Sequence, residues 1–299
     1  MCYLSLWLCL IGISGIALLP VQATLPPQEL EAVRDLFLAA HGYPWNETED
    51  PCTFWNQIHC EKNHVTKLEL RDDYQQTSLP ESIGNLQLLS VLDVSYNQLR
   101  SLPESIGKLQ ALSKLHVSHN NLTSLPESIG SFQDLSELLV ASNQLNSLPQ
   151  SIGKLQKLGW LDVSHNNLTS LPESIAKLQP LLQLYVSHNN LTSLPESIGS
   201  LRLLRELHVS SNQLTSLPES FGDLQQLGWL DVSHNQLTSL PEESIGKLQK
   251  LLWLDVSHNQ LTSLPESIGK MQKLDWLDAS YNQLTSLPEE SIGKLPRLS

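Results

Sequence analysis

Apolar residues recur along most of this chain in one short pattern that is repeated with few changes. Each unit reads Leu-x-x-Leu-x-Val-Ser-x-Asn-x-Leu-x-Ser-Leu-Pro-Glu-Ser-Ile-Gly-Lys-Leu-Gln, and the period is 23 residues, as from Asn97 to Asn120. The alternation of Leu158, Leu161 and Val163 with polar residues is typical of a short, half-buried strand. One such unit cannot bury its own leucines. The period therefore predicts a solenoid in which neighbouring units cover one another.

An asparagine follows each predicted strand, at the point where the chain must turn. Its amide can satisfy backbone groups that the turn leaves unpaired, and stacked units would align these amides in a ladder. Further along, Pro172 restricts the chain entering Glu173-Ser174-Ile175, where we expect a short 3₁₀ or helical turn. The predicted ladder consists of Asn97, Asn120, Asn143, Asn166, Asn189, Asn212, Asn235, Asn259 and Asn282.

The residues before the repeats have a different character. Residues 4–19 are apolar and uncharged, and Val21-Gln22-Ala23 is a small-x-small cleavage site. We interpret 1–23 as a secretory signal peptide, with a membrane anchor as the alternative. No second apolar run of this length follows, so we expect no membrane insertion of the mature chain.

Two cysteines, Cys52 and Cys60, remain once the predicted signal is removed. An even pair in a secreted chain favours a disulfide. Zinc binding is the alternative, but it would need two more ligands, and only His59 and His64 are close in the sequence.

The repeat resembles that of the leucine-rich repeat family from about residue 65 to the end of the sequence. Residues 24–64, with a helix predicted between Pro26 and Gly42 and with Cys52, Trp55 and Cys60, resemble the N-terminal cap of plant-type extracellular members. The resemblance implies a right-handed α/β horseshoe with a parallel sheet on its concave face and short helical turns on its convex face. It divides the chain into 1–23, the cap 24–64, and about ten repeats in 65–299 that lack a C-terminal cap.

One departure from the plant pattern is visible in every repeat. Plant extracellular repeats usually contain Gly-x-Ile-Pro, whereas this chain has Thr-Ser-Leu-Pro, as at Thr169 to Pro172. That version is closer to intracellular repeats of the Ras-scaffold type. We follow the cap and the predicted signal in expecting a chain that is secreted or lies on the outer face of the plasma membrane.

The strand positions that vary between repeats indicate where a ligand would bind. Adjacent strands lie about 4.8 Å apart, so aromatic residues in one column should form a strip. Exposed aromatics beside acids are typical of a binding patch; recent duplication of one unit, without selection for binding, is the alternative. The candidate residues are Trp160, Trp229, Trp253 and Trp276 in one column, Asp231, Asp255 and Asp278 in the next, and His234, His258 and Tyr281 directly before the ladder asparagines.

The composition and chemistry of these columns exclude several functions. The chain has 18 Lys+Arg against 31 Asp+Glu, a formal charge of −13, and would repel nucleic acid. Aspartate beside histidine can serve acid–base catalysis, but no nucleophile stands out and an open sheet excludes little water. We therefore expect no enzyme and no cofactor. Metal binding by His234 and His258 is conceivable, but solvated histidines are the simpler interpretation.

Four Asn-x-Ser/Thr sequons, at Asn46, Asn121, Asn167 and Asn190, are candidates for glycosylation. None lies in the repeats that carry the last three tryptophans. We expect a non-enzymatic secreted or cell-surface recognition module that binds a protein, peptide or glycan on its concave face. Resemblance to plant receptor ectodomains and polygalacturonase-inhibitor-like proteins implies signalling or defence. A truncated receptor ectodomain and a structural scaffold are the alternatives.

Overall fold

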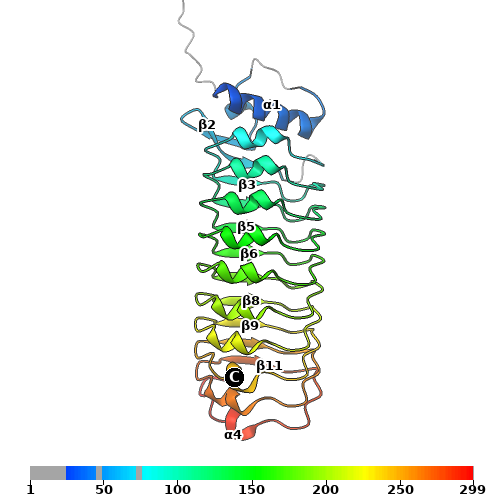
Figure 1. Cartoon of the computed structure of the whole chain (residues 1–299), viewed down its shortest axis with the longest axis vertical. Helices are drawn as coiled ribbons and strands as arrows, with labels where there is room; N and C mark the ends of the chain where they lie inside the picture. The colour runs from blue at the N-terminus through cyan, green and yellow to red at the C-terminus, as the bar shows by residue number, and fades with distance from the viewer. Residues whose placement is uncertain (1–24, 45–48, 72–75, 299) are drawn as a thin grey trace, which may run out of the picture.

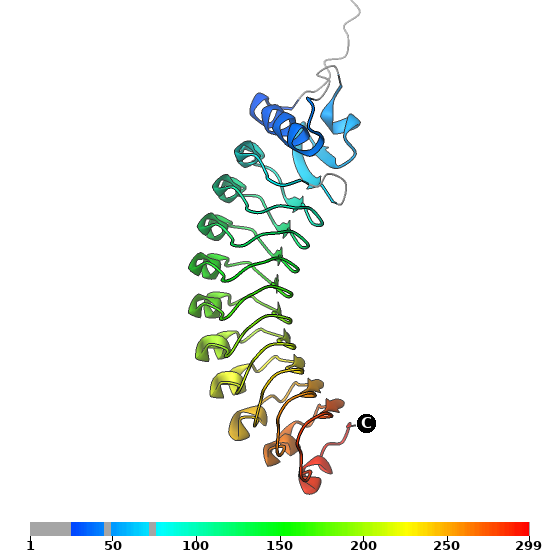
Figure 2. The ribbon, with the colours of Figure 1, turned by 90° about the vertical axis from the view of Figure 1, so that its right-hand side faces the viewer.

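The computed structural model describes residues 25–44, 49–71 and 76–298, which form a long, curved stack of repeats (Figure 1). Helix α1 (Pro27–His41) lies across one end, and the repeats follow in sequence order towards the other. The strands line the inner side of the curve and the short helical turns line its outer side, as Figure 2 shows. The predicted α/β solenoid is confirmed, whereas the predicted signal peptide, 1–23, lies outside the described residues.

Each repeat contributes one strand at the same place, so the strands join into one sheet. From β2 onward the pairs are parallel and in register, which puts Trp229, Trp253 and Trp276 side by side. Among the described residues the sheet has eleven strands in sequence order: β1 (Ile58–Glu61), β2 (His64–Glu69), β3 (Val91–Asp93), β4 (Lys114–His116), β5 (Glu137–Leu139), β6 (Trp160–Asp162), β7 (Gln183–Tyr185), β8 (Glu206–His208), β9 (Trp229–Asp231), β10 (Trp253–Asp255) and β11 (Trp276–Asp278).

Strand β1 departs from the all-parallel sheet that the family resemblance implies. It pairs antiparallel with β2. In the turn between them, Lys62 and Asn63 have positive φ angles of 49° and 65°. Both central residues of the tightest hairpins adopt this left-handed conformation. Because the turn contains no glycine, the sequence does not signal this hairpin.

The outer side of the solenoid consists of one short helical turn per repeat. Each begins directly after a proline; Pro172, for example, has φ −69° and ψ 146°. An extra glutamate, as in Pro241-Glu242-Glu243, lengthens the turn into one turn of α-helix without disturbing the strand register. The described turns are η1 (Glu81–Asn85), η2 (Glu104–Lys108), η3 (Glu127–Ser131), η4 (Gln150–Lys154), η5 (Glu173–Lys177), η6 (Glu196–Ser200), η7 (Glu219–Asp223), α3 (Glu242–Ile245), η8 (Glu266–Lys270) and α4 (Glu289–Ile292).

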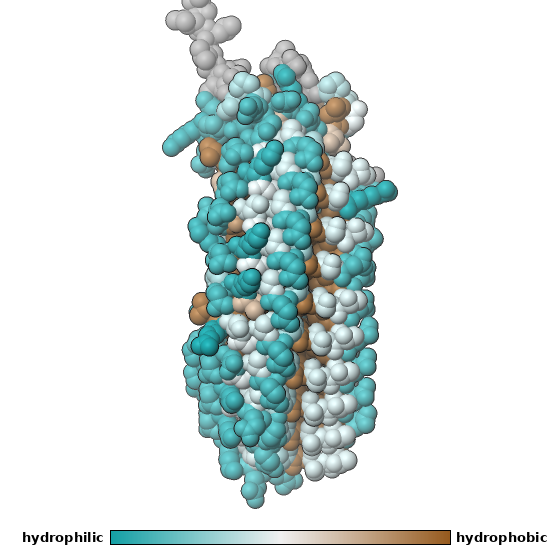
Figure 3. Space-filling view, in the orientation of Figure 1, coloured by the Kyte–Doolittle hydropathy of each residue, from teal (hydrophilic) through white to brown (hydrophobic). Residues whose placement is uncertain are grey.

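The interior is a continuous apolar core made of equivalent residues from every repeat. In one unit, Leu161, Leu168 and Ile175 are fully buried. Burial of each such side chain stabilises the fold by about 1.5–3 kcal/mol. On the outer face, Figure 3 shows mostly polar residues and one narrow apolar line running down the stack. That view of the outer face contains no broad apolar patch for a partner.

The ladder asparagines hold successive repeats together. Asn166 is 7% exposed, and its Nδ2 donates to the carbonyl oxygens of Val140, Val163 and Ser164 at 3.0–3.1 Å. Its Oδ1 accepts from the backbone N–H of Leu145 at 2.9 Å. The amide therefore satisfies backbone groups of its own repeat and of the preceding one.

Most repeats have glycine where the helical turns of neighbouring repeats approach each other, whereas turn η5 has Ala176 at this position. A Cβ at Gly199 would lie 2.3 Å from the carbonyl oxygen of Ser220 in the next turn. Gly159, directly before strand β6, differs in this respect: a Cβ there would lie 3.8 Å from the nearest atom, the carbonyl oxygen of Ser136. Close backbone approach therefore favours the glycine of the Ser-Ile-Gly segment, although it does not exclude alanine.

Replacing Gly199 with alanine is expected to destabilise the protein by about 1 kcal/mol, because the turns must shift to admit one methyl group, a change that Ala176 in η5 shows the fold can accommodate. Urea denaturation of purified protein measures the change. Gly159→Ala is the matched control, and its effect should stay within about 0.5 kcal/mol. Equal losses for the two variants would contradict the close-approach explanation.

The N-terminal cap is tied by a disulfide. Cys52 and Cys60 are joined with a Cα–Cα distance of 5.7 Å, so the disulfide prediction is confirmed and the zinc alternative is wrong. Trp55, between them, is buried and packs edge-on against Phe37 of α1 with ring centroids 5.2 Å apart. Helix α1 ends at Gly42, whose φ of 74° is the left-handed conformation common after helices.

A buried carboxylate also attaches α1 to the sheet. Glu29 is 4% exposed; it accepts from the backbone N–H of Val65 at 2.9 Å and lies 2.7 Å from Nδ1 of His64. Sequence patterning places Glu29 in the first helical turn and gives no sign of this contact. The contact of Glu29 with Val65 and His64 holds α1 against strand β2.

Candidate functional site

The inner face displays the two strand residues that flank each buried leucine. Around buried Leu161, for example, Trp160 and Asp162 are both partly exposed. Because the strands are in register, the same two columns run along the whole solenoid. The residues in these columns differ between the first and the second half of the stack, so the face has two chemically distinct parts.

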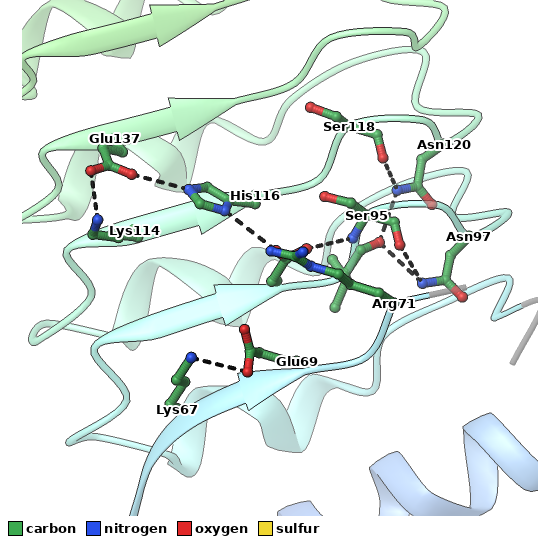
Figure 4. Close-up of polar contacts among 12 residues, drawn as sticks. Lys67, Glu69, Arg71, Ser95, Asn97, Lys114, His116, Ser118, Asn120 and Glu137 are labelled. Atoms are coloured by element: carbon green, nitrogen blue, oxygen red, sulfur yellow. Dashed lines mark hydrogen bonds and ion pairs between the residues drawn. The ribbon is translucent and has the colours of Figure 1, made fainter. Parts of the chain in front are cut away.

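Strands β2 to β5 carry a network of charged side chains that neutralise one another. Nδ1 of His116 lies 3.4 Å from Oδ2 of Asp93, and its Nε2 lies 3.2 Å from Oε2 of Glu137. The network consists of Lys67, Glu69, Arg71, Asp93, Lys114, His116 and Glu137, most of which Figure 4 shows. Since these charges have partners, this half of the face is already electrostatically satisfied.

The network shifts the pKa values of its members in the directions that pairing requires. Burial alone would raise the pKa of Asp93, but hydrogen bonds from His116 and Arg71 outweigh it and lower that pKa well below its usual range. The hydrogen bond to Asp93 raises the pKa of His116, against the opposing effect of burial. Both shifts therefore favour the charged forms.

A pH dependence of stability follows from His116. Its pKa is raised on folding, so its pairing contributes fully below the unfolded value of about 6.5 and is lost as pH rises through the folded value. The depressed pKa of Asp93 acts at the other end, because its contribution is present above about pH 4 and is lost on acidification. Wild type should therefore lose more stability between pH 6 and pH 9 than His116→Gln, which unfolding curves at about these pH values would measure. His119→Gln, an exposed histidine in the following turn, is the control, and a wild-type pH dependence in His116→Gln would contradict the assignment.

Strands β6 to β11 carry a continuous series of ring contacts, here called the aromatic track. It consists of Trp160, Tyr185, His208, Trp229, Trp253 and Trp276, with successive ring centroids 6.0, 4.5, 6.0, 4.4 and 3.5 Å apart. The track crosses from the first column to the second and back. Tyr185 and His208 were not among the predicted site residues, because a column-by-column comparison does not reveal diagonal contacts.

The last three tryptophans of the track form a parallel stack. The Trp229 and Trp253 rings are inclined by 7°, and the Trp253 and Trp276 rings by 15°. Trp229 is 37% exposed, and the other two are partly buried. Both faces of Trp253 are covered by its neighbours, so a ligand can touch mainly its edge.

Trp160 lies apart from this stack. It contacts Tyr185 edge-on, and its indole Nε1 is buried without a hydrogen-bond acceptor among the described residues. Tyr185 and His208 connect it to the stack. The hydroxyl of Tyr185 donates to Oε2 of Glu206 at 2.7 Å, and burial followed by this bond raises the pKa of Tyr185 far above its ordinary value. Burial lowers the pKa of His208, which favours its neutral form.

The predicted aspartates form side-chain hydrogen bonds to the backbone that the sequence did not indicate. In Asp231, Asp255 and Asp278, Oδ1 accepts from the backbone N–H two residues further on, at 3.0, 2.9 and 2.8 Å. Each carboxylate therefore fixes the turn that leaves its strand. One oxygen is engaged in this way, which reduces what the aspartates offer to a ligand.

The third predicted column, directly before the ladder asparagines, lies in a strained turn. His234, His258 and Tyr281 have φ angles of 52–53°, and their rings stack with centroids 4.0 and 4.1 Å apart. No hydrogen bond or ion pair within the described part of the chain joins them to Asp231, Asp255 or Asp278. The predicted histidines are therefore not paired with the predicted aspartates; Asp231 lies instead 4.0 Å from Nδ1 of His208. Within the described residues no cluster of three or more His, Cys, Asp or Glu could hold a metal ion.

A groove of about 580 Å³ opens beside the tryptophan stack, where strands β8 to β11 begin. It is lined by Gly228, Leu252 and the sides of Trp229 and Trp253. Its polar lining consists of Arg205, Glu206, Gln226, Lys250, Lys273 and Asp275. The sequence pattern does not indicate this groove, because the groove depends on the absence of a side chain at Gly228.

Three of the four predicted glycosylation sites lie in the described part of the chain. Asn121, Asn167 and Asn190 are exposed on the turns after their strands, and Asn46 lies outside the described residues. Their glycosylation stays a prediction. Within the described residues, no helix has the length and apolar character needed to cross a membrane.

Comparison with family models identifies the repeats. A model described as a leucine-rich repeat region matches residues 59–144 and 138–211, and one described as a leucine rich repeat matches 202–261 and 225–284. The chain belongs to the leucine-rich repeat family. No curated protein sequence gives a significant match.

Solved leucine-rich repeat structures resemble the chain in fold. The Arabidopsis receptor kinase HAESA, in complex with the peptide hormone IDA and the co-receptor SERK1, is 26% identical with a TM-score of 0.73, over 87% of this chain and 46% of HAESA. InlJ of Listeria monocytogenes is 24% identical with a TM-score of 0.66, over 76% and 47%. A leucine-rich repeat protein of Leptospira interrogans is 32% identical with a TM-score of 0.43, over 79% and 77%. The chain thus spans less than half the length of the HAESA structure.

Proposed function

We propose that this leucine-rich repeat protein is a non-enzymatic recognition module that binds an extended peptide segment of a partner along the aromatic track. The observation that carries the proposal is the division of the inner face. Its first half is a charge network that satisfies itself, and its second half presents partly exposed rings beside an open groove. Aromatic clusters of this kind dominate the binding energy of protein interfaces.

The stacking of the tryptophans favours a peptide over a glycan. A sugar ring packs against a free aromatic face, but both faces of Trp253 are occupied by Trp229 and Trp276. A peptide can instead run across the indole edges and place side chains to either side of the stack. HAESA, which shares the fold, was solved with a peptide hormone, and this supports a peptide ligand for the present chain.

We infer that the module works outside the cell. The cap contains the Cys52–Cys60 disulfide. Disulfides persist in oxidising compartments and are rare in the cytosol. The apolar residues 4–19 and the sequons at Asn121, Asn167 and Asn190 agree with a secretory route. Under this proposal 1–23 is a cleaved signal peptide and 24–64 is the cap.

Selection of a phage-displayed library of random linear peptides on the immobilised protein tests the proposed function. We expect a family of peptides whose binding slows amide hydrogen exchange in β6 to β11 and leaves β2 to β5 unchanged. Exchange reports local protection strand by strand, so it separates the two halves of the face. Failure to select any peptide, or protection confined to β2–β5, would sink the proposal.

A further inference from the structure

We propose that the groove at Gly228 is the specificity-determining subsite of this peptide site, and that it takes a large apolar side chain flanked by acidic residues. The inference rests on the proposed function and names the peptide chemistry that the site selects. It is carried by three features of the groove: its shape, its apolar walls and the charges at its rim.

The shape of the groove comes from one missing side chain. Equivalent positions in two other repeats hold Leu182 and Leu252, whereas this repeat has Gly228. A Cβ at Gly228 would find only the oxygens of Arg205 and Lys250, at 3.7 and 3.9 Å. The position therefore has room for a side chain that the protein does not supply, and a partner can fill it.

The walls of the groove belong to a concentration of exposed apolar surface. Leu252 is 43% exposed and Trp229 is 37% exposed. Leu182 and Leu203, at 37% and 50%, extend this surface along the same edge of the strands. An apolar side chain inserted at Gly228 would remove several of these groups from water at once, as buried anchor residues do at interfaces.

The charges around the groove favour an acidic partner. The lining contains three cationic residues, Arg205, Lys250 and Lys273, and two acidic residues, Glu206 and Asp275. Glu206 already accepts from Tyr185, and no salt bridge found within the described residues joins Arg205 or Lys273 to a carboxylate. Two exposed cations are thus left at the rim of an apolar groove, in a chain whose formal charge is −13. Carboxylates beside the inserted side chain would complete the pairing.

Gly228→Leu tests the subsite because it closes the groove from within. Leucine at the equivalent positions 182 and 252 shows that the strand column accepts it, so the variant should fold with an almost unchanged melting temperature. Gly159→Leu is the matched control, since its Cβ also meets open space, 3.8 Å from Ser136 O, and it lies outside the groove lining. Peptides selected on wild type are synthesised and titrated against both variants.

We expect the selected peptides to share a large apolar residue beside Asp or Glu. Gly228→Leu should weaken them about 10- to 100-fold, while Gly159→Leu should leave their affinity unchanged. Lys273→Gln should weaken them and reduce the salt dependence of binding. The subsite proposal would be wrong if the selected peptides bind Gly228→Leu as tightly as wild type, or if they lack acidic residues. The proposed function would still hold in that case, provided that the same peptides require Trp229, Trp253 and Trp276. If wild type selects no peptide, or if the selected peptides do not require these tryptophans, the subsite and the proposed function fall together.

Discussion

Replacing Asn166 with alanine is expected to lower the free energy of unfolding by about 2–3 kcal/mol, a large share of the stability of a typical domain. The buried N–H of Leu145 loses its acceptor, and three carbonyl oxygens each lose one of their two donors. The site is 7% exposed, so water cannot take the place of the amide without opening the stack. Urea unfolding monitored by circular dichroism measures the loss.

Asn282→Ala is the matched control for this prediction. Asn282 makes the same bonds, to the carbonyls of Val256, Ala279 and Ser280, but it is only partly buried in the last described repeat. Water can reach these groups, and the neighbouring Leu284 is itself only partly buried. We expect a loss of about 1 kcal/mol there. Equal losses at both positions would show that burial does not set the contribution of the ladder.

Replacing Trp229, Trp253 and Trp276 together with alanine is expected to weaken peptide binding at least ~100-fold, because tryptophan anchors each contribute about 2 kcal/mol or more at interfaces. The stack also supports the fold, so the variant should lose about 1–3 kcal/mol of stability through its two stacked contacts. Isothermal titration with a selected peptide, at a temperature where the variant is folded, separates the two effects.

A double variant in the other half of the face controls for the general loss of aromatic surface. Tyr96 and His119 stack with centroids 4.2 Å apart, and Tyr96 is 52% exposed. Tyr96→Ala with His119→Ala should leave peptide affinity within about twofold of wild type, because the pair lies outside the track. Undiminished binding by the triple tryptophan variant would instead support the interpretation that these repeats are copies without a binding role.

Much of the fold can be predicted from the sequence because the repeats are nearly identical. The 23-residue period sets one strand and one turn per unit, and buried Leu161 and Ile175 in one repeat determine where their equivalents lie in the next. The hairpin of β1 with β2 could not be predicted in this way. It depends on the left-handed conformation of Lys62 and Asn63, in a turn that contains no glycine.

The candidate site was predicted in outline only. The column of Trp229, Trp253 and Trp276 follows from register, since parallel in-register strands place equivalent residues side by side. Tyr185 and His208 escape such reasoning because they join the track by contacts between columns. The engagement of the aspartates by their own turns also escapes it.

The sequence by itself determined the repeat architecture, the asparagine ladder, the cysteine pairing and the strand column in which the tryptophans lie. These features depend on period and residue type, which one-dimensional order fully specifies. Only the tertiary structure showed that the charges on the first half of the inner face are paired, since Asp93 and Glu137 form ion pairs with residues of other repeats. It also revealed the groove at Gly228, because an empty space is defined by the atoms around it, and those atoms come from four successive repeats.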